Sequence, residues 1–356
     1  MIDITTFYLK SNKKFNYFYL DWEKSKVYWK KNIPKKAIKI GIVKCKNFLK
    51  NKTVTLCCSV NSYTILKNDK KINIKNIRHN YSKKNIPVLK SNLQKSIRRQ
   101  KVDVSKKTAI SLSLIEDNSN NIKQIGLFEL IRRLSVIIIE DVMLMPWFGI
   151  LVWLHSYMSK KYQIGEKVFD WIIEKVCYIS SFHHFDNEYI FYRYNQNFDN
   201  NKILLNDIKE NERNLLLSLL FRINYGGMDG DLIMFKKIIQ IWYDRFKNKS
   251  NICNFLLKLK YNKIINYQTL EPDEILLESI DFHCTPICIN VNKILNLEKK
   301  ELKKMIWINR SSINHRLPIK LKYTNLNNKY KINLWNKISE IVDNEAKIIR
   351  SNFIKN

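Results

Sequence analysis

The chain has 356 residues, of which 45% are hydrophobic and 12% aromatic, so it can bury a sizeable core and is not a disordered polymer. Only seven glycines and six prolines are present, which argues against a turn-rich all-β fold and favours helices. The formal net charge of +31 indicates a polyanionic partner, and residues 1–107 alone hold 28 Lys and Arg against 5 Asp and Glu, a net charge of +23.

Seven scattered cysteines lack the spacing of a disulfide framework, and the first ten residues lack the pattern of a secretion signal. We therefore expect reduced thiols and an intracellular protein that is not secreted, in the cytoplasm, a viral factory or the nucleus. An apolar run at 142–158 approaches the length of a membrane span. Pro146 and His155 interrupt this run and two acids adjoin it, so no membrane partner is expected.

Residues 1–87 are predicted to form a basic, β-rich N-terminal region that ends in a linker at 76–87. Apolar and aromatic runs such as FNYFYLDW, KVYWKK, AIKIGIV, TVTLCCSV and YTIL alternate with lysines, which indicates about four to six short strands. The interleaved aromatic residues are Phe15, Tyr17, Tyr19, Trp22, Tyr28 and Trp29. Such a pattern suits a surface that stacks bases, with Trp22, Tyr28 and Trp29 as candidates, and it equally suits a small sheet with an aromatic core.

Residues 88–356 are predicted to form an α-helical domain with a sub-boundary near 182–202, so the predicted fold is mainly α. Apolar residues recur there at spacings of three and four. The expected helices lie at 88–99, 104–116, 127–145, from Pro146 onward, 166–179, 204–223, 231–246, 272–281, 286–295, 297–309 and 330–353. Asp103 is expected to cap the second of them.

The most apolar stretch, 127–159, carries charged residues within a predicted helix, namely Glu129, Arg132, Arg133, Glu140 and Asp141. Charges in an apolar setting are costly unless they are paired, so we predict structural ion pairs. Arg133 lies one turn after Glu129 and about two turns before Glu140, which makes these two acids its expected partners. The alternative is that Arg132 or Arg133 contacts a phosphate.

A second basic cluster follows the linker, in SIRRQKVDVSKKTA. Arg98 and Arg99 lie at a predicted helix end, and Lys101, Lys106 and Lys107 surround the next helix start. These five residues are candidates for phosphate contact. The alternative is that the cations near the helix end interact with the helix dipole.

Motifs of nucleotide hydrolases, dinucleotide-binding enzymes, serine hydrolases and zinc proteases are absent, and no cofactor is predicted. In YGGMDGD, Gly226 or Gly227 is expected to end one helix, with Gly230 in the turn and Asp229 or Asp231 capping the next helix. The alternative is a glycine-rich backbone nest that holds a phosphate.

The segment DFHCTPIC brings His283, Cys284 and Cys288 close together in the sequence. A structural zinc ion usually takes four ligands with paired cysteine spacings, and this segment offers at most three. We therefore predict no metal, with these three residues as weak candidates that Asp281 or His183 and His184 could complete.

Residues 93–144 resemble the helical collar of the clamp-loader-like AAA+ ATPases that include the Werner-helicase-interacting ATPases and replication-associated recombination protein A. The matching residues are Ser96, Ile97 and Arg98, followed by Arg132, Arg133, Leu134, Glu140 and Asp141. The ATPase core has no counterpart here, so the resemblance implies an oligomerising helical module of DNA replication or repair without its motor. The composition also resembles that of proteins from large DNA viruses and other AT-rich genomes.

These observations predict a non-catalytic nucleic-acid-binding accessory factor in replication, recombination or repair. DNA is favoured over RNA, and a second copy of the chain or a replication protein is a further expected partner. One alternative is a metal- or acid-dependent enzyme acting on nucleic acid, with Asp229, Asp231, Asp281 and His283 at its centre. The other is an assembly protein whose positive charge is compositional.

Overall fold

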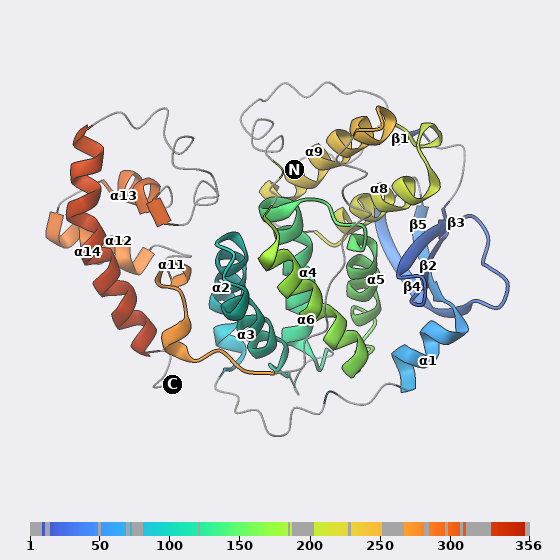
Figure 1. The fold of residues 1–356 in the computed structure, drawn as a ribbon, viewed down its shortest axis with the longest axis horizontal. Helices are drawn as coiled ribbons and strands as arrows, with labels where there is room; N and C mark the ends of the chain where they lie inside the picture. Colours follow the sequence, from blue (N-terminus) through green and yellow to red (C-terminus); the bar gives the residue numbers. More distant parts are fainter. Residues whose placement is uncertain are drawn as a thin grey trace.

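A computed structural model describes residues 9–10, 15–48, 51–68, 72, 81–117, 119, 122–183, 186, 203–226, 229–250, 267–280, 285–295, 298–306, 309–310 and 329–352. This part of the chain is mainly α-helical, with a small sheet near the N-terminus, which confirms the predicted fold class. Figure 1 shows the sheet and α1 at one end of the long axis, the C-terminal helices at the other, and most of the remaining helices between them.

The sheet has four strands in the order β3-β2-β5-β4. They are β2 (Tyr17–Asp21), β3 (Lys26–Lys30), β4 (Ile38–Phe48) and β5 (Asn51–Cys58). β2 pairs antiparallel with β3 and parallel with β5, and β4 pairs antiparallel with β5. A separate short pair joins β1 (Leu9–Lys10) to β6 (Ile203–Leu204). The order leaves β3 and β4 as the two edge strands.

The predicted strand at YTIL is wrong, because these residues lie in helix α1 (Val60–Asn68). The backbone N–H of Ser62 donates to Ser59 Oγ at 3.1 Å, so a serine caps the start of this helix. Aromatic and β-branched residues favour strands only weakly, and here they lie in a helix that begins at a serine cap.

The helical body largely follows the predicted periodicity. Its elements are α2 (Ile86–Arg98), α3 (Val102–Ser113), α4 (Ile125–Ile137), α5 (Phe148–Met158), α6 (Glu166–Ser181), α8 (Glu210–Ile223), α9 (Asp229–Lys247), α11 (Leu277–Ile280), α12 (Thr285–Leu295), α13 (Lys299–Ile306) and α14 (Lys329–Asn352). Several predicted boundaries change. Asp103 lies within the first turn of α3 and does not cap it. α8 begins six residues later than expected, because β6 and a 3₁₀ turn precede it. The predicted helix 272–281 divides into a 3₁₀ turn and α11.

The central apolar stretch contains a break between two helices. α4 continues into a π-helical turn, Ile138–Val142, and Met143 is extended. Pro146 and Trp147 form a turn, and α5 begins at Phe148. The expected short break with a second helix after it is therefore present. The wider π turn changes the direction of Glu140 and Asp141 relative to a continuous α-helix.

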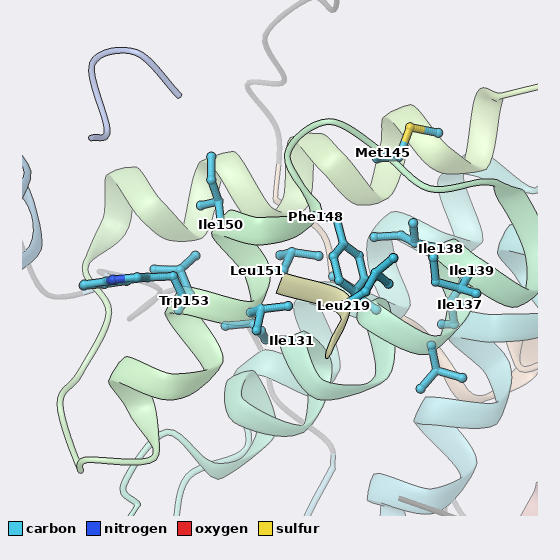
Figure 2. Close-up of a cluster of buried hydrophobic side chains, with 14 of the residues drawn as sticks. Ile131, Ile137, Ile138, Ile139, Met145, Phe148, Ile150, Leu151, Trp153 and Leu219 are labelled. Atoms are coloured by element: carbon cyan, nitrogen blue, oxygen red, sulfur yellow. The ribbon is translucent and has the colours of Figure 1, made fainter. Parts of the chain in front are cut away.

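Helix α5 is the centre of the core, since every residue from Phe148 to Met158 is buried. Figure 2 shows Phe148 and Leu151 of α5 close to Ile131 of α4, Leu219 of α8 and the isoleucines of the π turn. Trp153 extends the contact to the sheet, because its Nε1 donates to the backbone oxygen of Phe18 at 3.0 Å.

Gly149 allows the sheet and the helices to approach closely. A Cβ atom at this position would lie 2.4 Å from Val27 Cγ2 in β3 and 2.9 Å from Ser218 Oγ in α8. A methyl group does not fit there, so glycine allows α5 to touch both elements.

The buried apolar residues form two clusters. One includes the sheet and the helices up to Ile275, and the other consists mainly of residues from α12, α13 and α14. The sheet thus shares its core with the helical body. Whether residues 1–87 fold as a separate domain stays a prediction, as does the sub-boundary near 182–202, most of which lies outside the described residues. In the described part of the chain, no helix combines the length and the apolar character needed to span a membrane.

Candidate nucleic-acid interface

The sheet register separates the candidate aromatic residues onto two faces. Phe18 lies opposite Trp29 in the register, and their rings stack at 4.2 Å against the helices. Trp29 is 2% exposed, and its Nε1 donates to Ser218 Oγ at 3.2 Å. Trp29 is therefore a core residue, and its ring is not accessible for stacking on a base. The buried Phe15 belongs to the same hydrophobic cluster.

The opposite face of the sheet carries tyrosines and lysines. Tyr19 lies opposite Tyr28 on β3 and Cys57 on β5, and Tyr17 lies opposite Lys30. All three tyrosines are half-buried, and the rings of Tyr19 and Tyr28 lie 6.1 Å apart. Tyr28 thus remains a stacking candidate, while Tyr17 and Tyr19 join it because they share its face.

Lysines flank the tyrosines on the same face. The register places Lys26 and Lys30 on β3 and Lys39 and Lys44 on β4. We call these four lysines with Tyr17, Tyr19 and Tyr28 the tyrosine–lysine face. The Nζ of Lys30 lies 5.0 Å from the centre of the Tyr28 ring and 2.6 Å from Glu210 Oε1.

The loops at both ends of β3 add charge of the same sign. Lys24, Lys31, Lys35 and Lys36 are exposed there. Residues 15–45 contain eight lysines against two acids, Asp21 and Glu23. One of these acids is paired, since Asp21 Oδ2 lies 3.2 Å from Lys24 Nζ. The local field at this end of the molecule is therefore strongly positive.

Two groups beneath the face are held in their neutral forms. Burial raises the pKa of the Cys57 thiol to about 12, although Lys39 lowers it, and its Sγ donates to the backbone oxygen of Phe18. Burial, followed by the Asp21 charge, raises the pKa of Tyr19 above its ordinary value. The Tyr19 hydroxyl therefore stays protonated at neutral pH and adds no negative charge to the face.

Trp22 occupies a different place, in the turn between β2 and β3. It is half-buried, and its ring lies 5.5 Å from that of Trp171 on α6. Its backbone N–H donates to Ser62 Oγ at 2.8 Å. Trp22 packs at the end of the sheet, next to the tyrosine–lysine face and not within it.

Arg98, a candidate for phosphate contact, is 5% exposed and forms a buried ion pair. Its guanidinium donates through Nε and Nη2 to the two oxygens of Asp141, and Nη2 lies 3.6 Å from Glu140 Oε1. Burial alone would lower the pKa of Arg98, but Asp141 and Glu140 raise it above its ordinary value. Arg98 therefore holds α2 to the π turn and is not placed to contact a phosphate.

Two further candidates connect α2 and α3 to the segment around α11. Arg99 pairs with Glu278, and its Nη2 donates to the backbone oxygen of Arg310 at 2.7 Å. The Nζ of Lys107 lies 2.6 Å from Glu274 and 3.0 Å from Asp103. Lys101 is exposed and Lys106 half-buried, so these two keep their candidate role.

Glu129, Arg132, Glu140 and Asp141 form ion pairs, but the pairs predicted for Arg133 with Glu129 and Glu140 are wrong. Glu129 pairs with Lys90 at 2.6 Å and with Arg132 at 3.3 Å. Arg133 donates to Gln94 Oε1 instead of binding an acid. Gln94 Nε2 in turn donates to Glu140 at 2.8 Å and to Asp141 at 2.9 Å. The partner of Glu140 and Asp141 is thus Arg98, which lies 42 and 43 residues before them in the sequence. No helical spacing could indicate an ion pair between residues so far apart.

The glycine-rich turn ends α8 as expected. Gly226 has a φ of +72°, and its N–H donates to the backbone oxygen of Ile223 at 3.0 Å. The Nη1 of the buried Arg222 donates to the Gly226 oxygen at 2.9 Å. Gly230 and Asp231 lie inside α9, which begins earlier than predicted, and Gly227 lies outside the described residues.

Of the three candidate metal ligands, Cys288 lies among the residues that the structure describes. His283 and Cys284 lie outside the described residues, and Cys288 is buried in α12. Among the residues that the structure describes, no three His, Cys, Asp or Glu side chains are grouped so that they could hold a metal ion. Five cysteines there are buried, namely Cys45, Cys57, Cys58, Cys177 and Cys288.

Comparisons of the chain with protein-family profiles, with curated proteins and with solved structures find no match. The resemblance of residues 93–144 to the collar helices of clamp-loader-like ATPases therefore stays a prediction.

Proposed function

We propose that this protein binds single-stranded nucleic acid on the tyrosine–lysine face. The observation that carries the proposal is the sheet register, which collects Tyr17, Tyr19 and Tyr28 on one face between the lysines of β3 and β4. Tyrosine rings stack on bases of any sequence, and lysines neutralise the phosphates between them.

A single strand fits this face better than a duplex. A duplex buries the flat faces of its bases in the stack, whereas an unpaired strand can present them to aromatic side chains. The role we propose is that of a non-catalytic accessory factor in replication, recombination or repair, and the collar-like sequence of residues 93–144 supports DNA as the ligand. Affinity measurements with a DNA strand and an RNA strand of equal length distinguish the two kinds of ligand.

Binding is expected to depend steeply on salt. If about six phosphates are neutralised, log K should fall against log salt concentration with a slope of about −4 for a single strand. Fluorescence anisotropy with a labelled strand of about 20 nucleotides, at several salt concentrations, measures this slope. A slope near zero would contradict a phosphate-dominated interaction.

A pair of charge reversals locates the interface. Lys39→Glu with Lys44→Glu should weaken strand binding by at least about tenfold, since each reversal replaces attraction to a phosphate by repulsion. The matched control is Lys337→Glu with Lys347→Glu, which makes the same charge change on exposed positions of α14. Equal losses in both double variants would show that net charge, and not this face, determines binding.

A further inference from the structure

A pocket of about 530 Å³ opens beside the first residues of β3, where the tyrosine–lysine face ends. Lys26 belongs to both the face and the pocket lining. The remaining walls come from the turn before α5 and from α6, α8 and α9. A ligand in this pocket would thus lie next to a strand bound on the sheet.

The walls of the pocket suit a flat ring. Trp147 and Trp171 both line it, and their rings lie 5.8 Å apart in an edge-to-face arrangement. Both tryptophans are half-buried, so part of each ring is accessible. The Nζ of Lys175 lies 5.5 Å from the centre of the Trp171 ring. Pockets of this size with aromatic walls and a few polar groups are typical sites for small planar ligands.

Asn214 fixes the wall of the pocket where α8 meets β3. The residue lines the pocket and is 3% exposed. Its Oδ1 accepts the backbone N–H of Trp29 at 3.0 Å, which fixes the orientation of the amide. The amide therefore holds β3 against α8 and keeps this wall of the pocket in place.

The charges of the lining indicate where a phosphate would lie. Lys175 is paired with Glu174 at 2.8 Å, and the backbone N–H of Lys209 donates to Glu212. Two acids against three lysines leave the pocket close to neutral, which favours an uncharged group inside. The exposed Lys26 at the rim would then face the phosphate.

We infer that this pocket binds one unstacked nucleobase of the strand held on the tyrosine–lysine face, an inference that rests on the proposed function. The base lies against the indole rings of Trp147 and Trp171. Its phosphate remains outside, next to Lys26 and the first lysines of the sheet.

Two titrations of the full chain test the inference. The four nucleoside monophosphates should quench tryptophan fluorescence on binding, at least one of them with saturation, while ribose 5-phosphate should not. Trp171→Leu should abolish this response and weaken binding of a strand of about 20 nucleotides by about tenfold. Trp171→Phe keeps an aromatic wall and should retain both.

Three other results would overturn the inference, and they differ in what else they imply. Strand binding that is equally strong in Trp171→Leu and the original chain would remove the pocket from the interface and leave the proposed function intact. Quenching by ribose 5-phosphate as strong as that by the monophosphates would show a phosphate site instead of a base site. No strand binding at all would overturn the proposed function together with this inference. Thermal melting of each variant verifies that it is folded.

Discussion

Arg98 shows how a buried charge depends on its partners. Its guanidinium lies between Asp141 and Glu140 in a nearly solvent-free site. Arg98→Ala would leave Asp141 buried without its partner, so we expect the free energy of unfolding to fall by about 3–5 kcal/mol. Urea unfolding of the variant and of the original chain measures the difference.

Arg132→Ala is the matched control for this prediction. Arg132 also pairs with an acid, Glu129, but its side chain is 41% exposed. Such a pair is screened by water, and its loss should cost at most about 1 kcal/mol. Equal effects of the two substitutions would show that the Arg98 site is solvated.

The residue types of this network were predictable from the sequence, and its pairing was not. Acids and arginines inside an apolar helix require partners, which the sequence indicates. The partner of Asp141 is Arg98, and the two meet because α2 packs beside α4 and the π turn redirects the acids. Neither the packing nor the turn has a local signal that helical periodicity would detect.

His155 should make stability depend on pH. Burial, followed by the charges of Arg222 and Arg132, lowers its pKa well below the ordinary value. The folded protein therefore keeps His155 neutral, while an unfolded chain takes up a proton below about pH 6.5. The free energy of unfolding should consequently fall as pH falls below that value, by up to about 1.4 kcal/mol per pH unit, and this contribution is absent above it.

His155→Phe should remove this part of the pH dependence. The ring lies 4.7 Å from Phe128 and 4.5 Å from Tyr225, so a phenyl ring fits among aromatic neighbours. Neither ring nitrogen has a hydrogen-bond partner in the described part of the structure, so none is lost. Melting at pH 7 and pH 5 tests the prediction, with the exposed His183→Phe as the control that should keep the original dependence.

At the scale of elements, the sheet shows what alternation can and cannot predict. Neighbouring residues of a strand face opposite sides, so Tyr28 and Trp29 could not both be in the core or both be exposed. The sequence does not say which of them points inward. The register answers this, since Trp29 is paired with the buried Phe18 and its backbone N–H donates to Asn214 of α8.

The contact between α5 and the sheet leads to a prediction for Gly149. In Gly149→Ala the new methyl group would meet Val27 and Ser218 at distances that atoms do not tolerate. Separating α5 from β3 and α8 should lower the free energy of unfolding by about 1–3 kcal/mol. Gly230→Ala in α9 is the control, because a Cβ atom there meets nothing within 4 Å, and alanine favours a helix over glycine by about 1 kcal/mol. An unchanged free energy of unfolding in Gly149→Ala would show that α5, β3 and α8 can separate without cost.

At the scale of the whole molecule, the charge asymmetry was readable from the sequence and the connectivity of the core was not. Within residues 1–107, which hold the net charge of +23, the eight lysines of residues 15–45 lie at the end of the molecule that carries the tyrosine–lysine face, whereas α2 and α3 lie nearer its middle. A boundary at residue 87 would suggest that the helical body remains folded without the sheet. The main hydrophobic cluster instead includes Phe18, Trp29 and Leu56 together with α5 and α8.

Two truncated chains should therefore behave differently. Residues 1–280 contain the whole main cluster and the tyrosine–lysine face, and they lack the C-terminal cluster of α12, α13 and α14. This chain should unfold cooperatively and bind a single strand with nearly the original affinity.

Residues 88–356 lack the sheet, which exposes the side of α5 that carries Gly149 and Trp153 to water. Exposing such an apolar face removes a large part of the hydrophobic stabilisation, so this chain should show no cooperative transition and no strand binding. Thermal melting followed by circular dichroism distinguishes the two, and a cooperative transition of residues 88–356 near the original melting temperature would show that the sheet is an independent domain.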